Sequence, residues 1–375
     1  MAYKYCIFAV YMKKNKSYFD YLLQPFSLLR TKEVLRVNPT VIPERDTPIH
    51  PEMYEIDYDT STYSYNRLNT VEETFGGVDS PCISWINVDG LDKPGVEKIC
   101  AHYGIHPLIM EDILSRGQRP KMDEINGLVF CLLSMMYYNA ETKSVETEQV
   151  SLVLGKRFVI SFQEVPDKDV FQSVRDKLKI PESKLRQNGA DFLFYALIDA
   201  IVDHYYLVME RLGENIELLE EEVIRSPNSR SLAHITQIRK EMIVLKRNIA
   251  PVRELISGIL RSDTDLIEVR TEKYFKDIYD HIIQANDLAE NYRDMVINLQ
   301  DVYLSNVNLK LNEVMKVMAI VTCLLAPATV VGGIFGMNFD RIPLLHNQWG
   351  FFISVAIMLI VPIAMIVVFK RRGWF

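Results

Sequence analysis

The chain has 375 residues, 49% of them hydrophobic, which is enough to bury a sizeable core in one or two domains. Of its 42 Lys and Arg and 49 Asp and Glu residues, only five and two lie after Asn312, so residues 1–312 hold 37 basic against 47 acidic side chains, a net charge of −10. Nucleic acids are bound through Lys and Arg, so this balance argues against a nucleic-acid partner. It suits a surface that attracts cations, or simply a soluble one.

The five cysteines are scattered along the chain without a C-x-x-C pair, as expected in a reducing compartment. Residues 1–14 lack the basic flank and the small-residue cleavage site of a secretory signal. We therefore expect the bulk of the chain in the cytoplasm.

The first half of the chain has the pattern of an α/β domain. Residues 4–12, 83–88, 127–138 and 148–162 are rich in Val, Ile, Phe and Tyr and are predicted to be strands. Short helices are expected at 93–102 and 107–114. The prolines and polar residues of 38–70 give no clear pattern. We assign an α/β cytosolic domain to residues 1–190.

A helical period begins at Asp191, where apolar side chains recur every three or four positions through Leu219. A polar turn at 225–230 separates this helix from a second one at about 232–260, which should return antiparallel to it. A third pattern begins near Thr271 and meets no proline or glycine before Pro327. One unbroken helix of about 90 Å can therefore extend from a stalk, residues 191–312, into a membrane.

Two segments near the C-terminus, 317–339 and 350–369, contain no charged residue and are long enough to cross a bilayer. Trp349 and Trp374 flank the second segment, where aromatic side chains favour the membrane interface. Basic residues precede the first segment and follow the second, which places both termini in the cytoplasm. The resulting division is a transmembrane helix at 313–339, an external loop at 340–349, a second transmembrane helix at 350–369 and a basic cytosolic tail at 370–375.

The two spans differ in polarity. The second has a single polar side chain, Ser354, and suits a lipid-facing helix. The first carries a stripe of mostly small or polar residues at alternating spacings of three and four: Asn312, Met315, Ala319, Thr322, Ala326, Thr329, Gly333 and Gly336. Such a face either packs closely against helices or lines a water-filled path, and the residues alone leave both open. Two helices cannot enclose a pore, so a pore would require several copies of the chain.

The first span ends in Gly336-Met337-Asn338. Glycine lets a helix stop in a conformation that other residues resist, and Asn offers an uncharged carbonyl oxygen. A ring of such oxygens can hold Mg²⁺ through its water shell, because Mg²⁺ gives up water reluctantly.

These features resemble the CorA family of magnesium channels. Gly336-Met337-Asn338 lies at the end of the first of two C-terminal spans, together with Asn312-Glu-Val-Met-Lys-Val317, Pro327 and Gly332-Gly333 at the family's positions. Upstream, residues 106–114, 118–121 and 274–281 also resemble the family. The likeness extends from about Ser84 to the C-terminus.

The resemblance implies a funnel-shaped homopentamer in the cell (inner) membrane, with an α/β cytosolic domain, long stalk helices and two transmembrane helices. It implies influx of hydrated Mg²⁺, and of Co²⁺ and Ni²⁺, down the membrane potential. The absence of a G-x-x-x-x-G-K-[ST] loop accords with a process that uses no nucleotide.

Residue roles follow from the resemblance position by position. It assigns Gly336, Met337 and Asn338 to the selectivity filter. It assigns the pore lining to Asn312, Met315, Met318, Ala319, Thr322, Ala326, Thr329 and Gly333, with Met315 and Met318 forming an apolar constriction. Asp112 and Asp277 match a pair that holds regulatory Mg²⁺ between subunits, and Glu111 and Asp301 are weaker candidates for the same role. His281, one turn after Asp277, is interpreted as a histidine on the stalk surface rather than a metal ligand.

The chain departs from the family in two places. The outer loop has Ile342-Pro343-Leu344-Leu345 where many members carry an acidic residue, and Ala326 replaces a bulky apolar side chain. Two alternatives remain: a transporter of zinc or another transition metal within the family, and a membrane-anchored sensor or scaffold without transport. No nucleophile with a base stands out, so we do not expect an enzyme.

Overall fold

The computed structural model describes residues 51–78, 81–165, 169–225, 227–337, 342–344 and 347–374. The strand expected at 4–12 and the filter residue Asn338 lie outside these residues. The chain divides into two compact units, and each is described by itself. The first comprises Met1–Glu222 and Asn228–Leu299, and the second Val223–Pro227 and Gln300–Phe375.

The first unit is built on a seven-stranded sheet in the order β2-β1-β3-β7-β6-β5-β4. Only β3 and β7 pair in parallel; the other neighbouring strands are antiparallel. The strands are β1 (Glu52–Tyr58), β2 (Tyr63–Leu68), β3 (Ile83–Asp89), β4 (Lys121–Ile125), β5 (Leu128–Asn139), β6 (Ser144–Leu154) and β7 (Phe158–Gln163).

The predictions for 83–88 and 127–138 are confirmed as β3 and β5. The single strand predicted at 148–162 is wrong, because the chain turns back at Gly155 and forms β6 and β7. The Gly155 N–H donates to the Phe158 carbonyl at 2.9 Å, which closes the turn. A Cβ on Gly155 would lie 2.3 Å from the Phe158 ring, so a larger residue there would force this ring to move. Strands β1 and β2 both lie within residues 38–70, the segment whose sequence gave no clear pattern.

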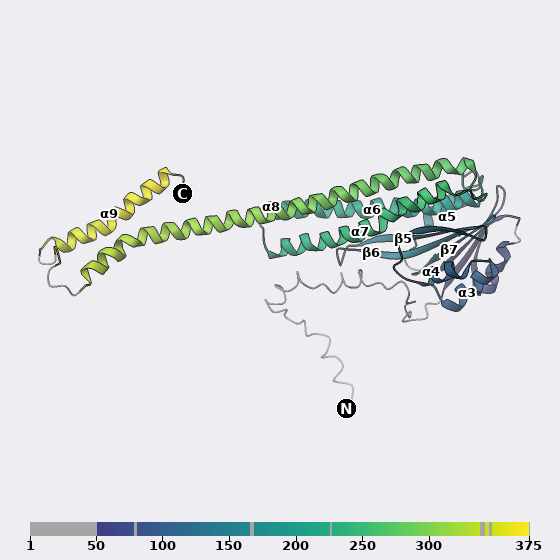
Figure 1. The fold of residues 1–375 in the computed structure, drawn as a ribbon, viewed down its shortest axis with the longest axis horizontal. Helices are drawn as coiled ribbons and strands as arrows, with labels where there is room; N and C mark the ends of the chain where they lie inside the picture. The colour runs from purple at the N-terminus through teal and green to yellow at the C-terminus, as the bar shows by residue number, and fades with distance from the viewer. Residues whose placement is uncertain are drawn as a thin grey trace, which may run out of the picture. The chain divides into compact units, whose positions relative to one another are not determined.

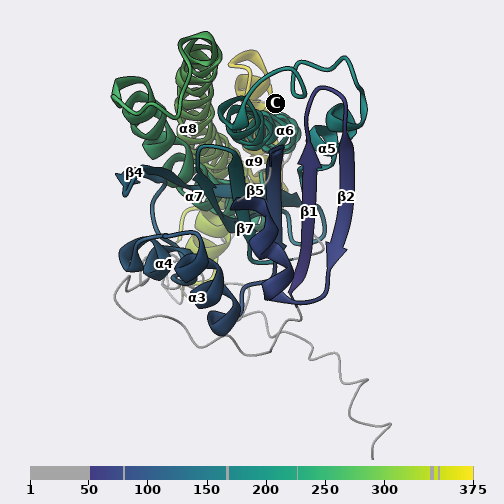
Figure 2. The same cartoon turned by 90° about the vertical axis from the view of Figure 1, so that its right-hand side faces the viewer.

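Two short helices cover one face of the sheet, α3 (Lys93–His102) and α4 (Pro107–Leu114), both as predicted. Asp92 accepts a hydrogen bond from the Gly95 N–H, and His106 accepts one from the Leu108 N–H, so each helix has a side-chain N-cap. The core beneath them includes Ile86 from β3 and apolar side chains from both helices. Figure 2 shows these helices on the side of the sheet opposite α6 (Ala190–Arg225) and α7 (Ser229–Arg261).

The helix predicted from Asp191 is α6, and its apolar stripe is buried in the first unit. The Tyr205 hydroxyl, fully buried, donates to the Ser134 carbonyl of β5 at 2.7 Å, which ties α6 to the sheet. By length and composition α6 could cross a membrane, but 56% of its most apolar window is buried within the protein. Helix α7 follows after a turn capped by Asn228, which accepts from the Arg230 and Ser231 N–H groups. A short helix, α5 (Gln172–Lys179), precedes α6.

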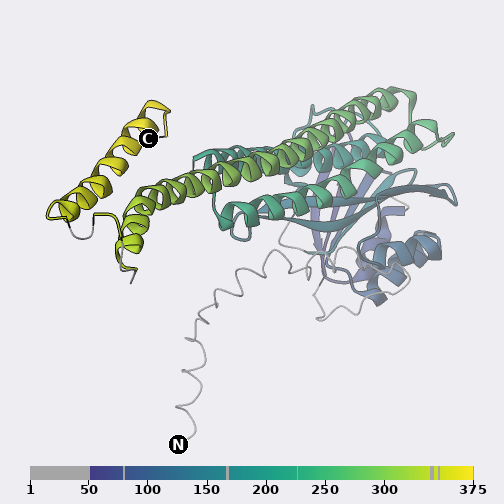
Figure 3. The same ribbon diagram turned by 60° about the vertical axis from the view of Figure 1, so that its left-hand side comes forward.

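The third predicted helix is α8 (Val269–Phe335), which runs for 67 residues through Pro327 without a break (Figures 1 and 3). At about 1.5 Å per residue its length is on the order of 100 Å. The last helix is α9 (Gly350–Arg371). In the second unit α9 packs antiparallel to the end of α8, because Lys316 donates to the Gly373 carbonyl at 3.5 Å while Gly332 faces Met358. Both helices have windows apolar enough to span a membrane, with 6% of each window buried.

Candidate functional site: an exposed polar stripe and acidic clusters

The predicted pore-lining residues are exposed in the single chain, as are most other residues of α8 from Leu311 onward, so their common face is given by their spacing and not by exposure. Met315 and Met318 are 60% and 64% exposed, and Asn312, Ala319, Thr322, Ala326, Thr329 and Gly333 are exposed wholly or in part as well. An uncharged helix with a polar exposed stripe has its partner in a membrane, another helix or a water-filled path.

The two threonines of this stripe are oriented by their own helix. Thr322 donates its hydroxyl hydrogen to the Met318 carbonyl at 2.8 Å, and Thr329 donates to the Leu325 carbonyl at 3.1 Å. Each hydroxyl has one hydrogen, so its oxygen is left as an acceptor toward the exposed side. The stripe therefore offers oxygen lone pairs and is suited to hydrated cations.

Two backbone hydrogen bonds end α8 at its glycine-containing C-terminus. The Gly336 N–H donates to the Gly332 carbonyl at 2.9 Å, and the Met337 N–H donates to the Ile334 carbonyl at 3.3 Å. Gly336 does not have a positive φ, so the expectation that it provides an unusual conformation is wrong. A Cβ at Gly336 would lie 3.1 Å from the Gly332 oxygen, which is a tight contact. Asn338, the next residue but one, is not among the residues described.

The four acidic residues proposed as ion sensors lie on two elements. Asp112 and Glu111 are on α4, where Asp112 is 13% exposed in its side chain and pairs with the Lys121 ammonium at 2.5 Å. Asp277 and Asp301 are on α8 and both are exposed. Asp112 and Asp277 are not joined by a contact within the described part of one chain. Their proposed pairing between subunits therefore stays a prediction.

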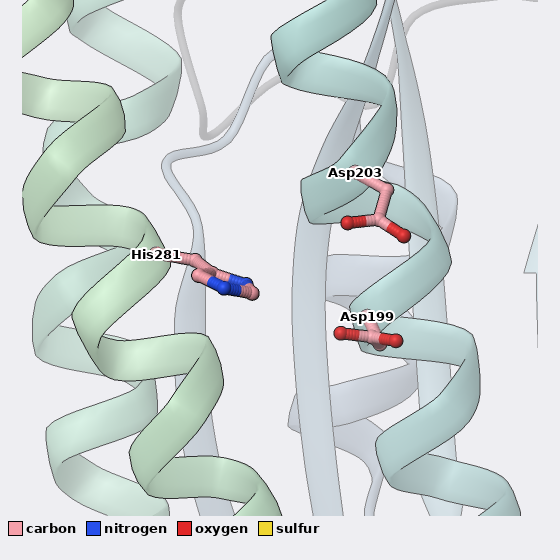
Figure 4. A group of neighbouring side chains, drawn as sticks. All are labelled: Asp199, Asp203 and His281. Carbon is pink, nitrogen blue, oxygen red and sulfur yellow. The ribbon is translucent and has the colours of Figure 1, made fainter.

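The structure brings together three other side chains that could hold a metal ion. Asp199 and Asp203, one turn apart on α6, face His281 of α8, and one ligand atom from each lies within 4.8 Å of the others (Figure 4). His281 is half-buried and faces the two aspartates, and its interpretation as a stalk-surface histidine rather than a metal ligand stays a prediction. The sequence signal was the i, i+4 pair of aspartates, but the third ligand comes from 78 positions downstream of Asp203.

Charge is concentrated at this cluster. Burial raises the pKa of Asp199 to about 6, and the Asp203 carboxylate adds to the rise. Lys177, a hydrogen bond from Tyr195 and His281 oppose it. A bound cation would relieve the repulsion between the two carboxylates. The donor set of two carboxylates and one imidazole suits Zn²⁺, Co²⁺ or Ni²⁺ better than Mg²⁺, which prefers oxygen and water.

An α/β unit followed by two helices apolar enough to span a membrane indicates a membrane protein. The CorA-like Mg²⁺ transporter family model matches residues 82–371, so the chain belongs to this family. This membership also confirms that the chain is a transport protein and not an enzyme.

Similar proteins cover most of the chain. The Cobalt/magnesium transport protein CorA of Thermotoga maritima is 38% identical over 336 residues, which is 88% of this chain and 95% of that protein. The Putative metal ion transporter YfjQ of Bacillus subtilis is 31% identical, over 80% of this chain and 92% of that protein. The complete structure of the CorA magnesium transporter from Methanocaldococcus jannaschii has the same fold, with a TM-score of 0.70 at 20% identity, covering 86% of this chain and 98% of that one.

Proposed function

We propose that the chain is a subunit of a channel that admits Mg²⁺, and also Co²⁺ and Ni²⁺, into the cytoplasm. The observation that carries this proposal is the polar stripe on the uncharged segment 317–335 of α8, where the hydroxyls of Thr322 and Thr329 donate to their own helix and leave their oxygens as acceptors. The names of the relatives, a cobalt/magnesium transport protein among them, support the same ions.

The basic residues that flank the two apolar helices support a topology with both termini in the cytoplasm. Helix α8 enters the membrane from the cytosolic side, α9 returns, and Lys370 and Arg371 end it in the cytoplasm. The α/β domain of residues 1–190 and the stalk of residues 191–312 lie in the cytoplasm. A divalent ion gains about 4.6 kcal/mol in crossing roughly 100 mV, so the membrane potential suffices to drive entry without a nucleotide.

Several copies must surround the path, because the stripe covers one face of one helix. We adopt the homopentamer that the family resemblance implies, with α8 on the inside and α9 toward lipid. Met315 and Met318, both exposed in the single chain, then form the apolar constriction near the cytosolic mouth. Gly336, Met337 and Asn338 form the filter at the outer mouth.

Regulation by internal Mg²⁺ is assigned to acidic residues of the cytosolic part. Asp112 and Asp277, with Glu111 and Asp301 in support, hold ions between neighbouring subunits. Lys121, which pairs with Asp112 in the isolated chain, must give way to the ion or share the carboxylate with it. Closure at high Mg²⁺ follows because the bound ions cancel repulsion between acidic subunits.

A second function is favoured by one observation, the Asp199, Asp203 and His281 cluster. Imidazole is a poor ligand for Mg²⁺ and a good one for Zn²⁺, Co²⁺ or Ni²⁺. A transporter of one of these metals, sensing its cargo at this cluster, is therefore the alternative to a magnesium channel.

Flux into proteoliposomes decides between the functions. Purified chain is reconstituted under a negative-inside potential, and entry of Mg²⁺, Co²⁺ and Zn²⁺ is followed with indicators inside the vesicles. Entry of Mg²⁺ that depends on the potential supports the channel. Entry of Zn²⁺ without Mg²⁺ supports the alternative, and folded oligomers that pass no divalent ion would leave a membrane-anchored sensor.

A further inference from the structure

A basic pocket lies between α7 and α8 in the first unit, where the two helices run side by side (Figures 1 and 3). Its volume of about 550 Å³ is within the usual range for sites that hold small organic molecules. Among the described residues its lining has no acidic side chain and five basic ones: Arg119, Arg239, Lys246, Arg247 and Arg293. A pocket with this lining repels cations and is suited to an anion.

Two of the five basic groups already have an acidic neighbour. Glu290 pairs with Lys246 and lies 3.5 Å from Arg293, so neither of these two is counted as available to a ligand. Arg119 and Arg239 are exposed, and no hydrogen bond or ion pair joins either of them to another described residue. Their two guanidinium groups are therefore available to bind an anion.

Apolar side chains lie beside the charges of this pocket. Ile243 of α7 and Ile297 of α8 belong to its lining and are 49% and 40% exposed. Ile243 stands between Arg239 and Arg247, four positions from each, which is about 6 Å along the helix in either direction. A ligand that fills the pocket therefore meets both positive charge and exposed apolar surface.

We propose that this pocket binds a nucleoside diphosphate or triphosphate, with the phosphates on Arg119 and Arg239 and the base against the exposed isoleucines. Arginine suits phosphate because its guanidinium group stays charged and can donate two parallel N–H bonds to the phosphate oxygens. A single inorganic phosphate would leave the isoleucines exposed and most of the volume unfilled. A nucleotide covers the apolar surface and neutralises the free positive charge in one molecule.

The nucleotide is a ligand of this pocket and not an energy source for transport. The chain has no G-x-x-x-x-G-K-[ST] loop, the motif that cradles phosphates through backbone N–H groups in many proteins that hydrolyse nucleotides. Because α7 and α8 both line the pocket, a bound nucleotide joins the two helices and stabilises the folded chain. The inference goes beyond the proposed function and does not depend on it.

Direct binding of ATP tests the pocket. The full-length protein, in a non-ionic detergent with EDTA to keep ATP free of Mg²⁺, is titrated with ATP in a calorimeter. We expect saturable binding of one ATP per chain, and a Kd at least tenfold higher in the double variant Arg119→Ala with Arg239→Ala. Both side chains are exposed, so this variant should fold, and its unfolding midpoint without ATP checks that it does. Arg253→Ala, on α7 but outside the pocket and paired with Glu254, is the matched control and should bind ATP as the parent does.

Two further ligands test which source of phosphate the pocket takes. Methyl triphosphate, which has the charge of ATP without the nucleoside, should bind roughly tenfold more weakly than ATP, and equal binding would overturn the choice of a nucleotide. Phosphatidylglycerol added to the detergent micelles should not displace ATP, and displacement would assign the arginines to a lipid headgroup instead.

The proposal is also overturned if ATP shows no saturable binding, or if the parent and the double arginine variant bind it with the same Kd. None of these measurements involves ion flux. Their failure would leave the proposed function standing, which the flux of Mg²⁺ into proteoliposomes tests separately.

Discussion

Asp199→Asn should stabilise the metal-free protein, and the structure gives the size of the effect. The pKa of Asp199 is raised from 3.8 to about 6, mainly by burial. A shift of about 2 units corresponds to roughly 3 kcal/mol, which is an upper limit because the side chain is only half-buried. Because the folded pKa lies above the unfolded one, the charged form costs stability above pH 6, and protonation removes this cost as the pH falls from 6 toward 4.

The assay is urea unfolding of the full chain in detergent with EDTA, followed by tryptophan fluorescence at about pH 8 and about pH 4.5. We expect Asp199→Asn to raise the free energy of unfolding by about 1–3 kcal/mol at the higher pH and by much less at the lower one. Asp294→Asn, on an exposed face of α8, is the control and should change little. A variant that is less stable than the parent at the higher pH would refute the reasoning.

Binding of Co²⁺ should reverse the order, so that the parent protein becomes more stable than Asp199→Asn. If Co²⁺ binds the cluster, the parent gains about 2.7 kcal/mol when free Co²⁺ is about 100 times its dissociation constant, whereas Asp199→Asn gains less. Equal gains in both proteins would show that Co²⁺ stabilises the chain at another site.

Three further predictions concern the pore, the sensor and the sheet. Asn338→Ala should nearly abolish Mg²⁺ entry into vesicles while the oligomer stays intact by light scattering; flux at the parent level would remove Asn338 from the filter. Replacing Asp112 and Asp277 by Lys puts fixed positive charge where ions are proposed to bind, so patch-clamp current should become less sensitive to internal Mg²⁺; closure at the same Mg²⁺ concentration would place the sensor elsewhere. Gly155→Val forces a Cβ against the Phe158 ring and should cost roughly 1–3 kcal/mol of stability in urea unfolding, and a neutral effect would contradict the tight turn.

Long-range periodicity was the part of the fold most readily predicted from sequence. The stripe of α6 and the absence of proline or glycine between Thr271 and Pro327 specified long helices, because every turn of a helix repeats the same signal. Strand β4 was missed, since its residues, Lys-Met-Asp-Glu-Ile, pair with only one neighbour at the sheet edge and are at most half-buried. The turn between β6 and β7 was missed because the residues before and after it are apolar and resemble one continuous strand.

For the candidate site too, the residues that share one helix could be predicted from the sequence, and those brought together from different helices could not. Residues of the exposed stripe are spaced along one helix, so their common face could be predicted from their positions alone. The cluster with His281 joins α6 and α8, and no local spacing reports which turns of two helices lie opposite each other.

The internal hydrogen bonds of Thr322 and Thr329 have a consequence for the speed of permeation. If this face lines the pore, an ion meets neutral oxygen atoms that accept hydrogen bonds from its water shell and no fixed charge between Lys316 and Gly336. Such contacts are weak, so an ion should stay only briefly beside each threonine. It can then leave without repulsion from a second ion that enters behind it. The wall still discriminates by sign, because it offers an anion no hydroxyl hydrogen from these threonines.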